Sequence, residues 1–197
     1  MKTKRTKYVE GDMFEALKKL DPDQTVYLPH VCNDVGAWGA GFVVPLARAF
    51  PKTRERYIAW HQGQPPPDCT YPGAESVKFG LGATQIMEVQ QQGEGPRIIV
   101  CNMIAQYGVA VMGLTRPIRY NHLVKCMESV ADHAIMQRKP TIHCPMFGAA
   151  LAGGDWNVIE PLIMDCWHRK ALEVTVYYLP GTLPTNWTLP PTEEKDP

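Results

Sequence analysis

The chain has 197 residues, of which 45% are hydrophobic, and this length suits one ordinary domain with a buried core. Twenty basic and twenty acidic residues give a formal net charge of zero, so the bulk charge does not favour a general nucleic-acid surface. No window approaches the ~20 apolar residues of a membrane span, and the basic N-terminal segment lacks the apolar stretch of a secretory signal. We therefore expect a cytoplasmic protein, with no membrane association, that binds a small ligand or a local epitope.

The first part of the chain alternates short strands with helices. Residues 7–10 (KYVE) suit a strand, Gly11 and Asp12 turn the chain, and MFEALKKL has the spacing of an amphipathic helix that Asp12 caps. Residues 24–30 form a β-rich run, which leads into VGAWGAGF at 35–42, here called the first glycine loop. FVVPLARAF and PKTRERYIAWHQ then carry helical apolar spacing, which predicts two helices.

Residues 63–82 are rich in proline and glycine, which predicts a surface excursion and a candidate lid. The segments 83–90 and 97–104 are separated by a turn-like QQGEGP and are expected to pair as a hairpin, with the second strand central in the sheet. Helical apolar spacing covers 118–137.

A short strand at 141–145 precedes FGAALAGGDW at 147–156, here called the second glycine loop. A helix over 157–170 and a strand over 174–179 complete an α/β pattern, which predicts a mixed sheet covered by helices on both faces. We expect one domain over residues 1–180 and a loosely held tail over 181–197, because the proline-rich tail has no periodicity.

The six cysteines are widely spread, and four lie in apolar segments, as is typical of reduced core thiols. Neither the cysteines nor the six histidines show the spacing of a zinc site, so we expect no metal and no cofactor.

Both glycine loops lie where a predicted strand leads into a helix. Ligands of open α/β sheets bind beyond the carboxyl ends of strands, where backbone N–H groups attract phosphate. Two such loops side by side would hold a nucleotide diphosphate from both flanks, although a single glycine loop is as often a plain connection. Neither loop matches the P-loop pattern or a complete dinucleotide-binding fingerprint, which argues against kinase-type and Rossmann sites.

The order and spacing of five segments resemble the macrodomains, a family of ADP-ribose-binding modules. The segments are the opening strand with Gly11 and Asp12, HVCNDVGAWGAGF, CNMIAQ, FGAALAGGDW and the closing VTVYYLP. The resemblance implies a three-layer α/β/α fold with a mixed, mostly parallel central sheet, and ADP-ribose or an ADP-ribosylated substrate as partner. GAGF and LAGGDW are similar to the branch that contains terminal ADP-ribose protein glycohydrolase and the yeast-type ADP-ribose 1″-phosphate phosphatase.

The resemblance also implies ligand contacts. Asp12 would accept a hydrogen bond from the adenine amino group, a role that is compatible with capping. Asn33 and Asp34 would face the distal ribose, or else bond to the local backbone. Trp38 would close over that ribose or fill the core. The remaining implied ligand-binding residues are Gly39, Ala40, Gly41, Phe42, Asn102, Phe147, Gly148, Ala149, Ala150, Leu151, Ala152, Tyr177 and Leu179, with Tyr178 an alternative adenine contact beside the last two.

The candidate catalytic residues depart from that branch, whose glycohydrolase uses a lysine nucleophile and a second-loop aspartate. Gln106 stands near the lysine position and Ala152 near the aspartate position, and an amide cannot form the covalent adduct with an opened ribose. Asp155 is expected either to activate water or to cap a helix. His30 and Asp34 are candidates for shared acid and base work, with plain hydrogen bonding as the alternative for the histidine.

Three functions follow from these residues. The favoured one is hydrolysis of a bond at the distal ribose, either de-ADP-ribosylation or ADP-ribose 1″-phosphate dephosphorylation. The second is a reader that binds ADP-ribose or a related nucleotide without turnover, as the replaced lysine and aspartate suggest. The third is a protein that acts through contacts of its proline-rich excursion or tail. A monomer is expected, although no sequence feature determines the oligomeric state.

Overall fold

The computed structural model describes residues 5–64, 77–91, 93–109 and 116–191. Its strands are β1 (Lys7–Glu10), β2 (Thr25–Asn33), β3 (Thr84–Gln90), β4 (Arg97–Gln106), β5 (Pro140–Pro145) and β6 (Glu173–Tyr178). Its helices are α1 (Met13–Leu17), α2 (Val43–Ala49), α3 (Lys52–His61), α4 (Tyr120–Ala134) and α5 (Trp156–Cys166), followed by the short 3-10 helix η2 (His168–Lys170). Each predicted strand and helix is present.

The strands form one sheet in the order β1-β6-β5-β2-β4-β3. Every neighbouring pair is parallel except the β3–β4 hairpin, which is antiparallel. The predicted mixed, mostly parallel sheet is confirmed. The main differences lie at element ends: the strand predicted over 24–30 continues to Asn33, and the helix predicted over 157–170 ends at Cys166 before the 3-10 helix.

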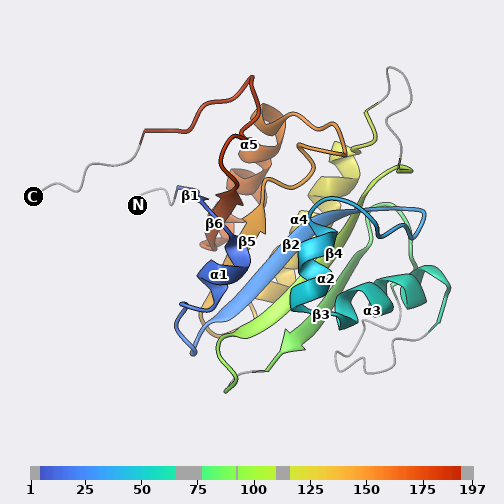
Figure 1. The fold of residues 1–197 in the computed structure, drawn as a ribbon, viewed down its shortest axis with the longest axis horizontal. Helices are drawn as coiled ribbons and strands as arrows, with labels where there is room; N and C mark the ends of the chain where they lie inside the picture. Colours follow the sequence, from blue (N-terminus) through green and yellow to red (C-terminus); the bar gives the residue numbers. More distant parts are fainter. Residues whose placement is uncertain (1–4, 65–76, 92, 110–115, 192–197) are drawn as a thin grey trace, which may run out of the picture.

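Helices cover both faces of this sheet, with α4 and α5 on one face and α1, α2 and α3 on the other (Figure 1). Because successive side chains of a strand point to opposite faces, β2 contributes to two cores. Tyr27 packs in the core under α4 and α5, with Trp156. Its neighbours Val26 and Leu28 pack in the other core, with Leu46 of α2. The predicted three-layer α/β/α fold is confirmed.

Five cysteines lie within the described residues, and all five are buried and unpaired: Cys32, Cys101, Cys126, Cys144 and Cys166. Burial raises the pKa of the Cys101 and Cys144 thiols well above the ordinary value, so these groups stay protonated and inert. The core-thiol prediction is confirmed for these five, and Cys69 lies outside the described residues. Within the described ranges, no three His, Cys, Asp or Glu side chains gather to hold a metal ion. No described helix is both long and apolar enough to cross a membrane.

The middle of the proline-rich excursion, residues 65–76, lies outside the described residues, and so does that part of the predicted lid. Its returning end packs on α3. The Phe79 ring lies 4.8 Å from the Trp60 ring between centroids, and the Trp60 indole N–H donates to the Val77 carbonyl at 2.7 Å.

The C-terminal segment packs more closely than its sequence predicts. Trp187 is only 8% exposed, and its ring centroid lies 4.9 Å from that of Tyr8. Its indole N–H donates to Glu160 Oε2 at 3.0 Å. Within the tail that the sequence predicts to be loosely held, Trp187 is therefore docked on the domain, because one large aromatic ring can anchor a segment that has no periodicity.

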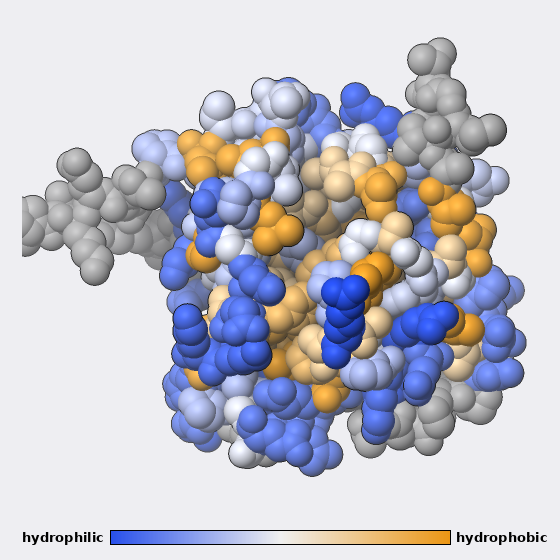
Figure 2. Space-filling model, in the orientation of Figure 1, coloured by the Kyte–Doolittle hydropathy of each residue, from blue (hydrophilic) through white to orange (hydrophobic). Residues whose placement is uncertain are grey.

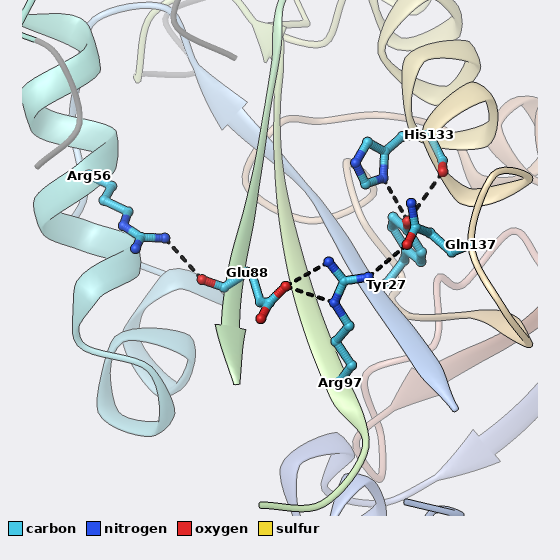
Figure 3. Close-up of polar contacts among 6 residues, drawn as sticks. All are labelled: Tyr27, Arg56, Glu88, Arg97, His133 and Gln137. Carbon is cyan, nitrogen blue, oxygen red and sulfur yellow. Dashed lines mark hydrogen bonds and ion pairs between the residues drawn. The ribbon is translucent and has the colours of Figure 1, made fainter. Parts of the chain in front are cut away.

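A polar cluster joins α3, the β3–β4 hairpin and the residues that follow α4 (Figure 3). Arg97 donates from Nε and NH2 to Glu88 Oε2, with both distances 2.7 Å. Arg97 also donates from NH1 to Gln137 Oε1 at 2.7 Å, and Arg56 donates to the Glu88 carbonyl at 3.0 Å. The Arg97 and Glu88 side chains are 24% and 21% exposed, so this ion pair is partly removed from water.

We predict that Arg97→Met lowers the free energy of unfolding by about 1–3 kcal/mol, because Glu88 and Gln137 each lose a hydrogen-bond donor in a partly desolvated place. Lys18→Met is the control, since its pair with Glu15 is largely exposed and should contribute little. Urea denaturation followed by tryptophan fluorescence measures both variants. An Arg97→Met protein as stable as the wild type would contradict the prediction.

Candidate functional site

A pocket of about 880 Å³ opens beyond the carboxyl ends of four adjacent parallel strands, β6, β5, β2 and β4. Their ends supply Tyr178, Pro145, Asn33 and Gln106 to its lining. Adjacent strands lie about 4.8 Å apart, so the row of four strand ends extends over roughly 14 Å. The pocket is therefore elongated across the sheet. In Figure 2, hydrophobic residues gather in the middle of the view, between α1 and α2 and toward the strand ends.

The first glycine loop forms one wall of the pocket through Gly39, Ala40, Gly41 and Phe42. Among the described residues, no backbone acceptor bonds the N–H groups of these four residues. Asn33 shapes the start of the loop: its Nδ2 donates to the Ala37 carbonyl at 2.7 Å, and its Oδ1 accepts from the Ala37 N–H at 2.9 Å. The side chain lines the pocket but is used for loop contacts, the alternative role considered for it.

The second glycine loop forms the opposite wall through Phe147, Gly148, Ala149, Ala150, Leu151 and Ala152. It closes on itself, because the Gly154 N–H donates to the Gly148 carbonyl at 2.8 Å. A Cβ at Gly154 would lie 2.5 Å from that oxygen, so only glycine allows this closure. Within the described ranges, the N–H groups of Gly148, Ala150, Leu151 and Ala152 have no backbone acceptor.

The two loops approach each other across the pocket. A Cβ at Gly41 would lie 3.0 Å from Leu151 Cδ1, and the φ of Gly41 is +73°. Each wall thus presents backbone N–H groups that have no backbone acceptor among the described residues, a composition that suits phosphate oxygens held between the walls.

The β6 end of the pocket contains Asp12, Phe14, Tyr177 and Leu179. Asp12 caps α1, because its Oδ1 accepts from the Phe14 N–H at 2.7 Å, and it also lines the pocket. The Phe14 ring stacks on Phe42, with centroids 5.7 Å apart and planes at 16°. This end therefore combines aromatic and aliphatic surface with one carboxylate.

The β4 end contains Gln106 but not Asp34. The Gln106 Nε2 donates to the Gly108 carbonyl at 2.8 Å, and Asp34 Oδ1 accepts from the Gly108 N–H at 2.7 Å. Both side chains therefore hold the turn that follows β4. Gln106 lines the pocket, whereas Asp34 lies outside the lining.

His30 lies at the pocket floor and is only 1% exposed. Its Nε2 lies 2.6 Å from Asn102 Oδ1, and the Asn102 Nδ2 donates to Gln85 Oε1 at 2.9 Å. The three residues are cross-strand neighbours on β2, β4 and β3. Because Asn102 donates onward through Nδ2, its Oδ1 accepts from the His30 Nε2–H. Asn102 is fully buried beside His30 and does not line the pocket, contrary to its predicted ligand contact.

Burial lowers the pKa of His30 to about 4, with the hydrogen bond to Asn102 opposing that shift. The imidazole is therefore neutral near pH 7.

Asp155 and Trp38 take the alternative roles considered for them, and neither lines the pocket. Asp155 caps α5, where its Oδ1 accepts from the Asn157 N–H at 3.0 Å. Hydrogen bonds from the Asn157 side chain and backbone hold the pKa of this carboxyl below its usual value. Trp38 donates to the Val43 carbonyl at 3.1 Å and packs against Tyr57 in the core.

The pocket also contains residues that sequence reasoning did not select as ligand contacts. They are Gly11, Met13, Phe14, Val31, Cys32, Ala37, Val43, Pro45, Val109, Pro145, Met146, Thr182 and Pro184. Most of them adjoin segments that were selected, so taking whole strand ends would have found them. Thr182 and Pro184 are different, because no sequence pattern in the segment after β6 indicates that it forms part of a pocket wall.

The fold and the site together define an α/β/α module with a pocket at the carboxyl ends of its parallel strands. No family model matches the chain. It is 33% identical to a macrodomain protein from Streptomyces coelicolor, with a TM-score of 0.66, over 88% of this chain and 99% of that structure. The chain belongs to the macrodomain family.

Other similar proteins differ in what is known of them. A Bacteroides thetaiotaomicron protein of unknown function is 32% identical, with a TM-score of 0.71, over 88% of this chain and 98% of that one. Thermosipho africanus DarTG, solved in complex with ADP-ribose, is 16% identical, with a TM-score of 0.62, over 93% of this chain and 42% of its own. An ADP-ribose 1″-phosphate phosphatase from Candida albicans is 21% identical over 162 residues, 80% of this chain and 91% of that protein.

We predict that His30 makes the folded protein less stable in mild acid. Its pKa is about 4 when folded and near 6.5 in the unfolded chain, so the unfolded state takes up a proton first as the pH falls. The contribution of His30 to the free energy of unfolding is therefore constant above about pH 6.5. It declines toward pH 4, by at most about 1.4 kcal/mol per pH unit.

His30→Gln should flatten that decline, since its amide still donates to Asn102 but does not titrate. Urea unfolding at pH 7.5, 6, 5 and 4.5 measures the slope. His61→Gln is the control, because His61 is exposed and hydrated in both states. Equal slopes in His30→Gln and wild type would show the prediction to be wrong.

Proposed function

We propose that this macrodomain binds ADP-ribose, or ADP-ribose carried by a larger molecule, with the diphosphate between the two glycine loops. The observation that carries the proposal is the pair of facing walls whose backbone N–H groups lack acceptors in the described backbone. A diphosphate offers acceptor oxygens to both walls at once. The names of the Candida relative and of the Thermosipho complex support the same ligand.

The two ends of the pocket suit the two ends of this ligand. Adenine would lie at the β6 end against Tyr177 and Leu179, where Asp12 is the carboxylate of the lining. Asp12 Oδ1 is used by the Phe14 N–H, which leaves Oδ2 to accept from the adenine amino group. The distal ribose would lie at the β4 end, beside Asn33 and Gln106.

Gly41→Val tests the diphosphate site. Its side chain would enter the gap beside Leu151, and a β-branched residue is strained at φ +73°. We expect the Kd for ADP-ribose, measured by calorimetry, to rise at least tenfold, about 1.4 kcal/mol. Gly63→Val is the matched control, because Gly63 has φ +69°, no described atom lies within 4 Å of an added Cβ, and the residue lies outside the pocket lining. Equal affinity in both variants would argue against this site.

Hydrolysis at the distal ribose is a second candidate function, favoured by the relative named as an ADP-ribose 1″-phosphate phosphatase. Of the four candidate catalytic residues, we propose Asp34 as the general base. Its backbone N–H donates to the Gln106 carbonyl at 2.9 Å, so it lies beside the β4 end, next to the pocket lining but not part of it. Among the described residues, Gly108 bonds only its Oδ1. Oδ2 would take a proton from an attacking water. Neutral His30 is a weak base, Gln106 has no basic group, and Asp155 is used as a helix cap.

If the protein is a hydrolase, Asp34→Asn should lower turnover about 100-fold or more and leave the Kd for ADP-ribose nearly unchanged. The amide Oδ1 can still accept from Gly108, so the turn is preserved. Release of phosphate from ADP-ribose 1″-phosphate and of ADP-ribose from a modified peptide are the measurements.

Asp155→Asn is the comparison variant. A loss of rate in Asp155→Asn but not in Asp34→Asn would move the base to the second loop. A wild-type protein that binds ADP-ribose and turns over neither substrate is a reader.

A further inference from the structure

The segment that follows β6 forms part of the pocket wall. We call residues 179–187 the C-terminal strap; three of them, Leu179, Thr182 and Pro184, line the β6 end of the pocket. A tight turn shapes its first part, where the Thr182 hydroxyl donates to the Leu179 carbonyl at 2.7 Å and accepts from the Leu179 N–H at 3.1 Å. That turn sets the strap's local shape but does not attach it to the domain.

An aromatic attachment lies at the far end of the strap, outside the pocket lining. Trp187 is buried against Tyr8 and meets Trp156 edge-to-face, with centroids 6.5 Å apart. The Glu160 carboxylate joins both partners, because Oε2 accepts from the Trp187 indole N–H at 3.0 Å and Oε1 accepts from the Tyr8 hydroxyl at 2.7 Å. The Trp156 indole donates to the same Tyr8 hydroxyl at 3.2 Å.

A second attachment links the strap to the start of α5. The Asn157 side chain donates to the Asn186 carbonyl at 3.0 Å, and the Asn186 side chain donates to Asp155 Oδ1 at 3.2 Å. Asp155 caps α5 from within the second glycine loop. The carboxylate predicted to do chemistry thus connects the loop on one wall of the pocket to the strap on another.

The part of the strap that lines the pocket contacts the core through Leu183, which is partly buried. It contains neither helix nor strand, and Leu179 is 56% exposed. Figure 1 shows the segment, in red, leaving β6 and passing along α5. A segment of this kind loses conformational freedom when it is fixed, and an anchor that fixes it before binding removes that cost from the binding step.

We propose that Trp187 is a positioning residue for the ligand: its docking on Tyr8 and Glu160 holds Leu179, Thr182 and Pro184 in place as a preformed wall at the β6 end. The inference rests on the proposed binding of ADP-ribose. The inference assigns a binding role to the strap. Its first residues would contact the ligand, and its last residue, Trp187, would hold it on the domain.

The test uses the full chain, with Trp187→Ala and Trp187→Phe. We expect the Kd for ADP-ribose to rise at least tenfold in Trp187→Ala, measured by calorimetry at a temperature where the variant is fully folded. Trp187→Phe keeps a ring against Tyr8 but loses the bond to Glu160, so a smaller rise is expected. Leu189→Ala is the matched control, because Leu189 is 39% exposed and lies outside the lining, and its Kd should equal that of the wild type.

Hydrogen exchange of the strap amides separates positioning from general destabilisation. In Trp187→Ala without ligand, these amides should exchange fast, and saturating ADP-ribose should slow them, whereas in the wild type they exchange slowly in both states. If Trp187→Ala does not fold, Trp187→Phe and Glu160→Gln carry the same two measurements.

A Kd within twofold of the wild type in folded Trp187→Ala overturns the inference and leaves the proposed function standing. A wild-type protein that does not bind ADP-ribose overturns the proposed function itself, and the inference with it.

Discussion

The parallel pairing of β2 with β5 is the contact on which the pocket depends. Val26 pairs with Thr141 and Tyr27 with Ile142, so two strands more than a hundred residues apart run side by side in one direction. Parallel strands end at the same edge of a sheet, and each strand leads into a glycine loop. The two loops therefore become the two walls of one pocket, close enough that Leu151 covers the place where a side chain at Gly41 would lie.

Side chains in and beside these loops hold the loops in shape. Asn33, Asp34 and Asp155 each accept a hydrogen bond from a backbone N–H near the pocket. These bonds fix the loops. They also occupy side-chain atoms that could otherwise bond to the proposed ligand. The family relationship supports the proposed ligand binding, and so do the wall N–H groups that have no acceptor in the described backbone. The proposed hydrolysis has less support, because the candidate carboxylates already accept hydrogen bonds and the relative named as a phosphatase is distant.

The two described ends of the chain meet near the β6 end of this pocket. Tyr8 of β1 contacts Trp187, and both bond to Glu160 of α5. Edge strand β1 and the strap thus stabilise each other, and the part of the chain that looked least ordered takes part in shaping the pocket. The opposite end of the sheet is held separately, by the Arg97 and Glu88 pair.

Local patterns in the sequence were sufficient for the strands, the helices, the Asp12 cap and both glycine loops, because these features depend on neighbours within a few residues. They also indicated the family, because the order and spacing of the five segments resemble the macrodomains even where single residues differ. Only the tertiary structure decided which polar residues form contacts between distant parts of the chain. Asp34 meets the Gly108 N–H across 74 residues, and Asn186 meets Asp155 across 31. A carboxylate accepts a hydrogen bond from whichever donor the fold brings close to it, and the local sequence does not indicate which donor that is.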